Sequence, residues 1–211
     1  SAGFRVECPR SIKEIALEQP FSEVGGKLAG RVTVEGTPTL AGERVRIDLC
    51  DRRNRVLMRH EAPLTGSSVA FSFPVPEWFP MLVRVEATLL SGNEPATRAY
   101  TYFNVTKRNR GQFNFLIWDT PNGTLAPYAQ ESLVRCGMTL QLRSGTPPRY
   151  VQAYDVAWVP YTTRIMSPKT EQGIMKPCCW NDEEAITQYV QKIVEPYRES
   201  RQSGVFVYSL G

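Results

Sequence analysis

The segment Arg44–Cys50 reads RVRIDLC, and it decides the fold of the first half of the chain. Its apolar residues Val45, Ile47 and Leu49 alternate with polar ones. Successive side chains of a strand point to opposite faces, so this alternation places one face on a core and the other in water. We therefore expect a strand that is buried on one side.

Segments of the same kind lie on both sides of this strand, and Gly, Pro, Asn and Ser residues separate them. Short alternating strands with such turns between them are typical of a β-sandwich. The strands that we expect are Lys27–Glu35, Arg44–Cys50, Val56–His60, Val69–Val75, Leu82–Leu90 and Ala99–Val105. The first half of the chain is therefore predicted to be an all-β domain.

After Lys107 the pattern changes to compact apolar runs that alternate with helical segments. The stretch with Pro147 and Pro148 is expected to be poor in helix. A succession of strands and helices of this kind is typical of right-handed β/α units that form a parallel sheet. The predicted strands are Phe113–Trp118, Met138–Leu142, Val156–Tyr161 and Val205–Leu210, and the predicted helices are Thr124–Gly137 and Asn181–Ser203.

The two helices are predicted from apolar stripes and from their end residues. Gly137 is expected to end the first helix. Asn181 or Asp182 can cap the second helix, Pro196 is expected to bend it, and Gly204 to end it. The apolar stripe expected on the first helix consists of Leu125, Tyr128, Ala129, Leu133 and Cys136.

The succession of elements resembles the β-galactosidase, β-glucuronidase and β-mannosidase group of glycoside hydrolases. Pro80–Lys107 is similar to the last hairpin of the small sandwich in that group, and Phe113–Asp119 (FNFLIWD) is similar to a first barrel strand. Leu133–Leu142 resembles the step from a barrel helix through Gly to the next strand. The resemblance implies an immunoglobulin-like β-sandwich over residues 1–108 and the N-terminal half of a TIM-barrel-like β/α domain over residues 109–211.

The resemblance also implies a function, which is hydrolysis of O-glycosidic bonds in oligo- or polysaccharides. In that group the acid/base carboxylate follows the fourth barrel strand and the nucleophile lies near the seventh, so both would lie beyond Gly211. The chain is then expected to be an inactive fragment, completed by the remainder of the same polypeptide or by another chain. No catalytic residue is nominated, and no cofactor or metal is implied.

Barrel enzymes carry their sites at the C-terminal ends of the strands, and this rule selects candidate residues. Aromatic rings stack on sugar rings, while amide, guanidinium and carboxylate groups bind hydroxyls, so a mixture of these groups suits a carbohydrate cleft. The predicted substrate-binding residues are Trp118, Asp119, Tyr161, Arg164, Trp180, Asn181 and Tyr208. Structural roles compete with this interpretation: Trp118 in a core, Asp119 in a turn, and Asn181 in a helix cap.

The chain has five cysteines and one histidine, which limits the chemistry open to it. A zinc site is not expected, because such sites use closely spaced cysteines and usually histidine. His60 lies in a predicted strand, which argues against a Ser-His-Asp triad. Cys8, Cys50 and Cys136 are expected to be small core residues.

The formal net charge is +4, and the basic residues are scattered along the chain. Nucleic-acid binding is not expected, because it needs Lys and Arg gathered on one face. No apolar run approaches the roughly 18 residues that span a bilayer. No signal peptide is visible, so the compartment stays open, with a periplasmic or secreted location favoured over a cytoplasmic one.

Two alternative functions remain at this point. One is a non-catalytic carbohydrate-binding or adhesion module that uses the β-sandwich. The other is an α/β enzyme of different chemistry, such as an amidotransferase-like domain with Cys136 or Cys178 as nucleophile, although the histidine that such a nucleophile needs is missing.

Overall fold

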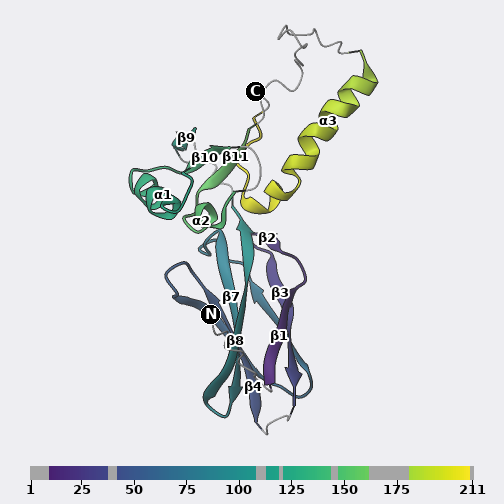
Figure 1. The fold of residues 1–211 in the computed structure, drawn as a ribbon, viewed down its shortest axis with the longest axis vertical. Helices are drawn as coiled ribbons and strands as arrows, with labels where there is room; N and C mark the ends of the chain where they lie inside the picture. Colours follow the sequence, from purple (N-terminus) through teal and green to yellow (C-terminus); the bar gives the residue numbers. More distant parts are fainter. Residues whose placement is uncertain are drawn as a thin grey trace, which may run out of the picture. The chain divides into compact units, whose positions relative to one another are not determined.

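A computed structural model describes residues 10–37, 42–107, 113–118, 121–143, 147–161 and 181–209 (Figure 1). The chain divides into two compact units, Ser1–Val105 and Thr106–Gly211. Among the described residues, the first unit consists of strands and turns, and the second combines helices with a parallel sheet. The fold is therefore β plus α/β.

Two sheets make up the first unit. One has the strand order β1-β3-β6 and the other β2-β8-β7-β4-β5. The pairs β1–β3, β3–β6, β4–β5, β4–β7 and β7–β8 are antiparallel. The strands run over Arg10–Leu17 (β1), Phe21–Glu23 (β2), Lys27–Gly36 (β3), Glu43–Cys50 (β4), Val56–Pro63 (β5), Ser68–Pro74 (β6), Leu82–Ser91 (β7) and Glu94–Thr106 (β8).

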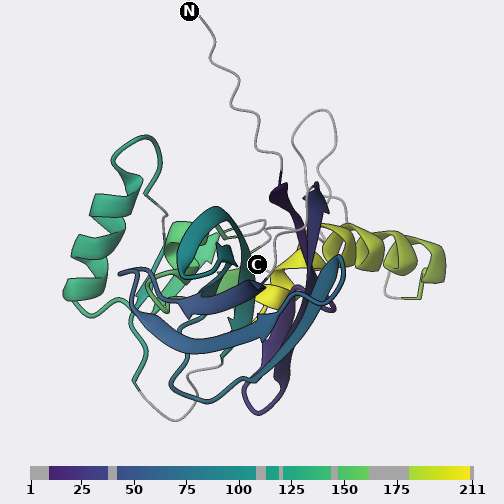
Figure 2. The same ribbon diagram turned by 90° about the horizontal axis from the view of Figure 1, so that it is seen from below.

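Both sheets contribute to one apolar core, which contains residues of β3 and β6 from one sheet and of β4, β7 and β8 from the other. In Figure 2 the strands of the larger sheet curl around this interior. Val45, Ile47 and Leu49 of β4 are completely buried in the core. The buried face predicted for this strand is therefore confirmed.

Each strand predicted between Lys27 and Val105 is present, with small differences at its ends. The two strands before Lys27 were not predicted. In β1 the register against β3 shifts between Ile12 and Glu14. Such a β-bulge interrupts the period of two, so the sequence RSIKEIAL does not alternate although it pairs along its whole length.

A parallel sheet forms the centre of the second unit, with the order β11-β10-β9. Residues 205–209 continue it next to β11 through two isolated parallel bridges, Trp158–Val205 and Tyr161–Ser209. The predicted parallel sheet is therefore confirmed for β9, β10 and β11, whereas residues 205–209 of the strand predicted over Val205–Leu210 form isolated bridges and no continuous strand. The elements are β9 (Leu116–Ile117), α1 (Ala126–Arg135), β10 (Leu140–Arg143), α2 (Arg149–Gln152), β11 (Ala157–Pro160), α3 (Glu183–Tyr197) and the 3₁₀ helix η1 (Glu199–Ser203).

Helices cover one face of this sheet. Ile117, Gln141 and Trp158 lie in register on neighbouring strands, so their side chains share a face. Trp158 is completely buried, and side chains of α1 and α2 pack around it together with Ile117. The opposite face carries Leu140 and Val159, which are also buried. A parallel sheet buried on both faces explains why its strands read as continuous apolar runs.

The apolar stripe predicted on the first helix is correct only for Leu133, which packs against the core, and its other four residues are exposed. Leu125 and Tyr128 are 71% and 72% exposed, while Ala126 and Gln130 are buried. The face of α1 that is buried contains the polar residue Gln130. The prediction used only the spacing of apolar residues, and it therefore selected a neighbouring face of the helix. Cys136, which was expected in the core, is exposed at the C-terminal end of this helix.

The stretch after Pro147 was expected to be poor in helix, but it forms the short helix α2. Pro148 is its N-cap and has an extended backbone. A proline in this position does not oppose a helix, because it lacks only an N–H that the first turn leaves unpaired.

The start and the end of α3 agree with the prediction. Asp182, one of the two candidate caps, accepts a hydrogen bond from the backbone N–H of Ala185 at 3.0 Å. The helix continues into η1, and Gly204 follows with a φ of 68°. That left-handed conformation favours glycine and ends the helical segment. Among the described helices, none is long and apolar enough to cross a membrane.

Candidate functional site

The carboxyl ends of the parallel strands bring predicted site residues to one edge of the sheet. Trp118 directly follows β9, Tyr161 directly follows β11, and Tyr208 lies at the end of the fourth parallel segment. Parallel strands end at the same edge of their sheet, which is where α/β proteins bind ligands. Three other predicted residues, Asp119, Arg164 and Trp180, lie outside the described residues.

Trp118 and Tyr161 contact each other. Their ring centroids are 5.0 Å apart, and their planes meet at 62°. β10 lies between the strands that carry them, so the two side chains meet across its end. Trp118 is 68% exposed. An edge-to-face pair of this kind holds the two rings in a defined orientation while a large aromatic surface remains open to solvent.

Tyr197 of α3 extends this pair toward Tyr208. Its hydroxyl donates a hydrogen bond of 2.5 Å to the backbone carbonyl oxygen of Tyr161. Its ring is nearly buried, and the centroid lies 6.1 Å from that of Tyr208. Trp118, Tyr161, Tyr197 and Tyr208 therefore form a continuous series of contacts, which we call the aromatic row.

The sequence did not single out Tyr197, because it fitted the apolar stripe of the last helix. A buried tyrosine nevertheless needs a partner for its hydroxyl. That hydroxyl was the available signal. The partner is a backbone carbonyl group, and such a partner cannot be predicted from the types of the residues.

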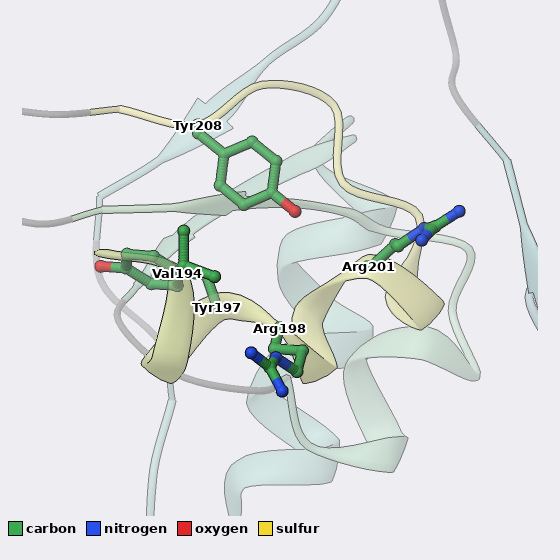
Figure 3. Close-up of a pocket in the computed structure, with 5 residues that line it drawn as sticks. All are labelled: Val194, Tyr197, Arg198, Arg201 and Tyr208. Atoms are coloured by element: carbon green, nitrogen blue, oxygen red, sulfur yellow. The ribbon is translucent and has the colours of Figure 1, made fainter. Parts of the chain in front are cut away.

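Tyr208 lies at the opposite end of the row from Trp118 and lines a hollow beside α3 (Figure 3). The hollow has a volume of about 310 Å³. It is lined by Val194, Tyr197, Arg198, Arg201 and Tyr208. The side chain of Tyr208 thus lies against the C-terminal part of α3.

Asn181 is not brought to the aromatic row. It precedes α3, whereas Tyr197 is the last residue of that helix. A helix of 15 residues rises by roughly 22 Å at about 1.5 Å per residue. Asn181 is exposed next to the capping residue Asp182. It therefore lies at a helix cap, which was the structural role considered beside a binding role.

No described carboxylate of the second unit follows the carboxyl end of a strand. Glu131 accepts hydrogen bonds from Arg135 at 2.7 Å and from the hydroxyl of Tyr154 at 3.2 Å. Asp182 caps α3, and Glu195 pairs with Arg198. Glycoside hydrolysis by the usual routes needs two carboxyl groups on either side of the scissile bond. Among the described residues of the second unit, no such pair of carboxyl groups lies at the ends of the strands.

Comparison with known proteins gives weak matches. No family model matches the chain, and no curated protein matches it. One similar solved structure is the Bifidobacterium dentium β-glucuronidase complexed with coumarin-3-O-glucuronide, at 16% identity and a TM-score of 0.41, covering 72% of this chain and 31% of that one. Another is the Parabacteroides merdae β-glucuronidase, at 8% identity and a TM-score of 0.43, covering 96% and 28%.

A β-glycosidase from Bacteroides vulgatus is similar to the same degree, at 11% identity and a TM-score of 0.40, covering 96% of this chain and 30% of that one. The chain spans about a third of the length of these solved structures. Likenesses of this strength leave the family of the chain open.

Proposed function

We propose that this chain is the N-terminal part of a glycoside hydrolase that acts on O-glycosidic bonds of oligo- or polysaccharides. In this proposal an immunoglobulin-like β-sandwich precedes the first half of a β/α barrel. The observation that carries the proposal is the aromatic row along the carboxyl ends of parallel strands, with Trp118 and Tyr161 in contact.

The strand order supports an immunoglobulin-like arrangement of the first unit. In that fold the first, second and fifth main strands share one sheet, and the third strand lies with the last two in the other. The sheet β1-β3-β6 corresponds to the former, and β4, β7 and β8 are neighbours in the latter. β5 then extends the second sheet next to β4, as the extra strand of the variable-type domain does.

Two features of the second unit support a partial barrel: the order of its parallel segments and the two edges of its sheet. Four parallel segments follow each other in chain order, and helices α1 and α2 cover one face. Among the described residues, β9 and residues 205–209 each have a neighbour on one side. Phe113, Phe115 and Leu116 at the β9 edge are exposed. Further strands at these edges would pair them and bury that apolar surface.

The exposed ring of Trp118 and the half-buried ring of Tyr161 suit a sugar chain. The C–H faces of a pyranose pack on aromatic surface, and apolar walls with a few polar groups are the usual composition of a ligand site. In the proposal these residues form part of the sugar subsites, and the two catalytic carboxylates lie outside the described residues. Asp119, Arg164 and Trp180 remain proposed contributors in addition to Trp118 and Tyr161.

Binding of soluble oligosaccharides by the 211-residue chain tests this proposal. The variant Trp118→Ala is expected to weaken binding about tenfold, because one stacked aromatic ring contributes on the order of 1.4 kcal/mol. Trp78→Ala is the matched control, since Trp78 is a 58% exposed tryptophan of the first unit. Isothermal titration calorimetry measures both. Loss of binding in the Trp78 variant alone would contradict the proposal and favour a carbohydrate-binding module based on the sandwich.

Turnover is a separate test of where the carboxylates lie. The purified 211-residue chain is expected to release no product from aryl glycosides, because no carboxylate pair is assigned to it. Hydrolysis above the background, with a rate that follows the protein concentration through purification, would refute this placement of the catalytic groups. The binding experiment remains informative in either case.

A further inference from the structure

The hollow beside α3 has the composition of a small-molecule site (Figure 3). It lies between the last turns of α3, the η1 helix and the segment that contains Tyr208. Its volume of about 310 Å³ is at the lower end of the range for pockets that enclose small ligands. The hollow shares Tyr197 and Tyr208 with the aromatic row, whereas Trp118 and Tyr161, the proposed sugar-stacking pair, do not line it.

The walls of the hollow are apolar and aromatic. Val194, Tyr197 and Tyr208 supply them, and the two rings stand 6.1 Å apart at 60°. The hydroxyl of Tyr197 is engaged with the carbonyl of Tyr161, which fixes this ring in place. Aromatic groups pack on one another at such distances and angles, so the walls present a preformed surface for another ring.

The polar groups of the hollow are of one charge. Arg198 and Arg201 line it, and among the described residues no acidic side chain does. Arg198 donates to Glu195 at 3.0 Å, but the two side chains are 70% and 68% exposed. An exposed pair of this kind contributes little to stability, so a ligand carboxylate can replace Glu195 at small cost. Guanidinium groups bind carboxylates with two parallel hydrogen bonds.

We propose that this hollow binds a small ring-bearing carboxylate, such as an aryl or cyclic carboxylic acid. The ring packs on Tyr197 and Tyr208, and the carboxylate binds Arg198 or Arg201. The two parts of the ligand are both required, because the aromatic walls and the guanidinium groups lie in the same hollow.

Titration of the 211-residue chain with benzoate, followed by NMR, tests the two requirements. Benzyl alcohol serves as the ring without the charge, and acetate as the charge without the ring. Benzoate is expected to bind saturably, and each control ligand about fivefold more weakly or worse. Equal binding of benzoate and benzyl alcohol, or no saturation up to the solubility limit of benzoate, would overturn the proposal.

Variants locate the site. The substitutions Arg198→Gln and Arg201→Gln are expected together to weaken benzoate binding at least fivefold, whereas Arg135→Gln leaves it unchanged. Arg135 is the matched control because it is an exposed helical arginine with a nearby glutamate partner and does not line the hollow. Glu195→Gln is expected to tighten binding, since it releases Arg198. An equal effect of the Arg135 variant, or weaker binding in the Glu195 variant, would contradict the assignment.

Discussion

Asp51 organises the turn between β4 and β5 through both of its carboxylate oxygens. Oδ1 accepts hydrogen bonds of 2.9 Å from the backbone N–H groups of Arg53 and Arg55, and Oδ2 accepts one of 2.7 Å from the Arg55 guanidinium. Asn54 in the same turn has a φ of 61°. These contacts hold a backbone conformation that most residues avoid.

The substitution Asp51→Asn is expected to lower the free energy of unfolding by about 1–3 kcal/mol, because the new amide group cannot accept all three hydrogen bonds. Urea unfolding measures the loss. Arg53→Ala is the control, since Arg53 donates through its backbone and keeps that contact. An equal loss in both variants would mean that the turn depends on the arginine side chain instead.

The same carboxylate predicts a pH dependence. Burial raises the pKa of Asp51, but the hydrogen bonds from Arg55 and Arg53 outweigh it and hold the pKa below its ordinary value. The unfolded chain therefore binds this proton more tightly than the folded one. The stabilisation is present above the ordinary aspartate pKa of about 3.9 and is lost as the pH falls through the lower folded value. Acid titration of unfolding should show a smaller loss for Asp51→Asn than for the unchanged chain.

Gln130 is a polar residue in an apolar environment. It is completely buried on α1, and neither atom of its amide group has a hydrogen-bond partner among the described residues. An unpaired buried amide costs about 1–3 kcal/mol, so Gln130→Met is expected to stabilise the protein by up to this amount. Thermal unfolding measures it, with the exposed Gln188→Met as control. A lower melting temperature would show that the amide group has a role that methionine cannot replace.

At the scale of elements, the strands of the first unit were predictable because one face of each is buried. Val45, Ile47 and Leu49 show the pattern most clearly. β1 was not predicted, because a β-bulge interrupts the alternation of its residues. The buried face of α1 was not predicted, because it contains the polar residue Gln130. Local periodicity therefore identifies the buried face of an element only where that face is both regular and apolar.

The sequence predicted those residues of the candidate site that lie at the ends of strands. Trp118 and Tyr161 were selected because each follows a strand, and the structure brings their rings together. Tyr197 was missed because its hydroxyl partner is the backbone of Tyr161. Asn181 was selected by its place before a helix, and the length of that helix separates it from the row.

One hydroxyl group of α3, that of Tyr197, bonds to the backbone directly after β11. Tyr197→Phe removes the hydrogen bond to the carbonyl oxygen of Tyr161 and is expected to cost about 0.5–1.5 kcal/mol. Tyr128→Phe is the control, because Tyr128 is an exposed tyrosine on another helix. Chemical denaturation followed by probes in the second unit measures both. No difference between the two variants would contradict the proposed role of Tyr197 in positioning Tyr161.

At the scale of the whole molecule, the two units differ in how they are built. The first unit encloses its core between two sheets whose strands alternate along the sequence. The second unit adds parallel strands in chain order and gathers their ends at one edge. The proposed sugar site needs this second arrangement only, because every residue of the aromatic row lies in the second unit.

The most direct test of the central claim is a double-mutant cycle on oligosaccharide binding with Trp118→Ala, Tyr161→Ala and the double variant. The rings touch, so both should contact the same sugar chain, and their effects should be coupled by about 0.5–3 kcal/mol. Strictly additive effects, or an affinity that neither substitution changes, would contradict a sugar site at the ends of these strands.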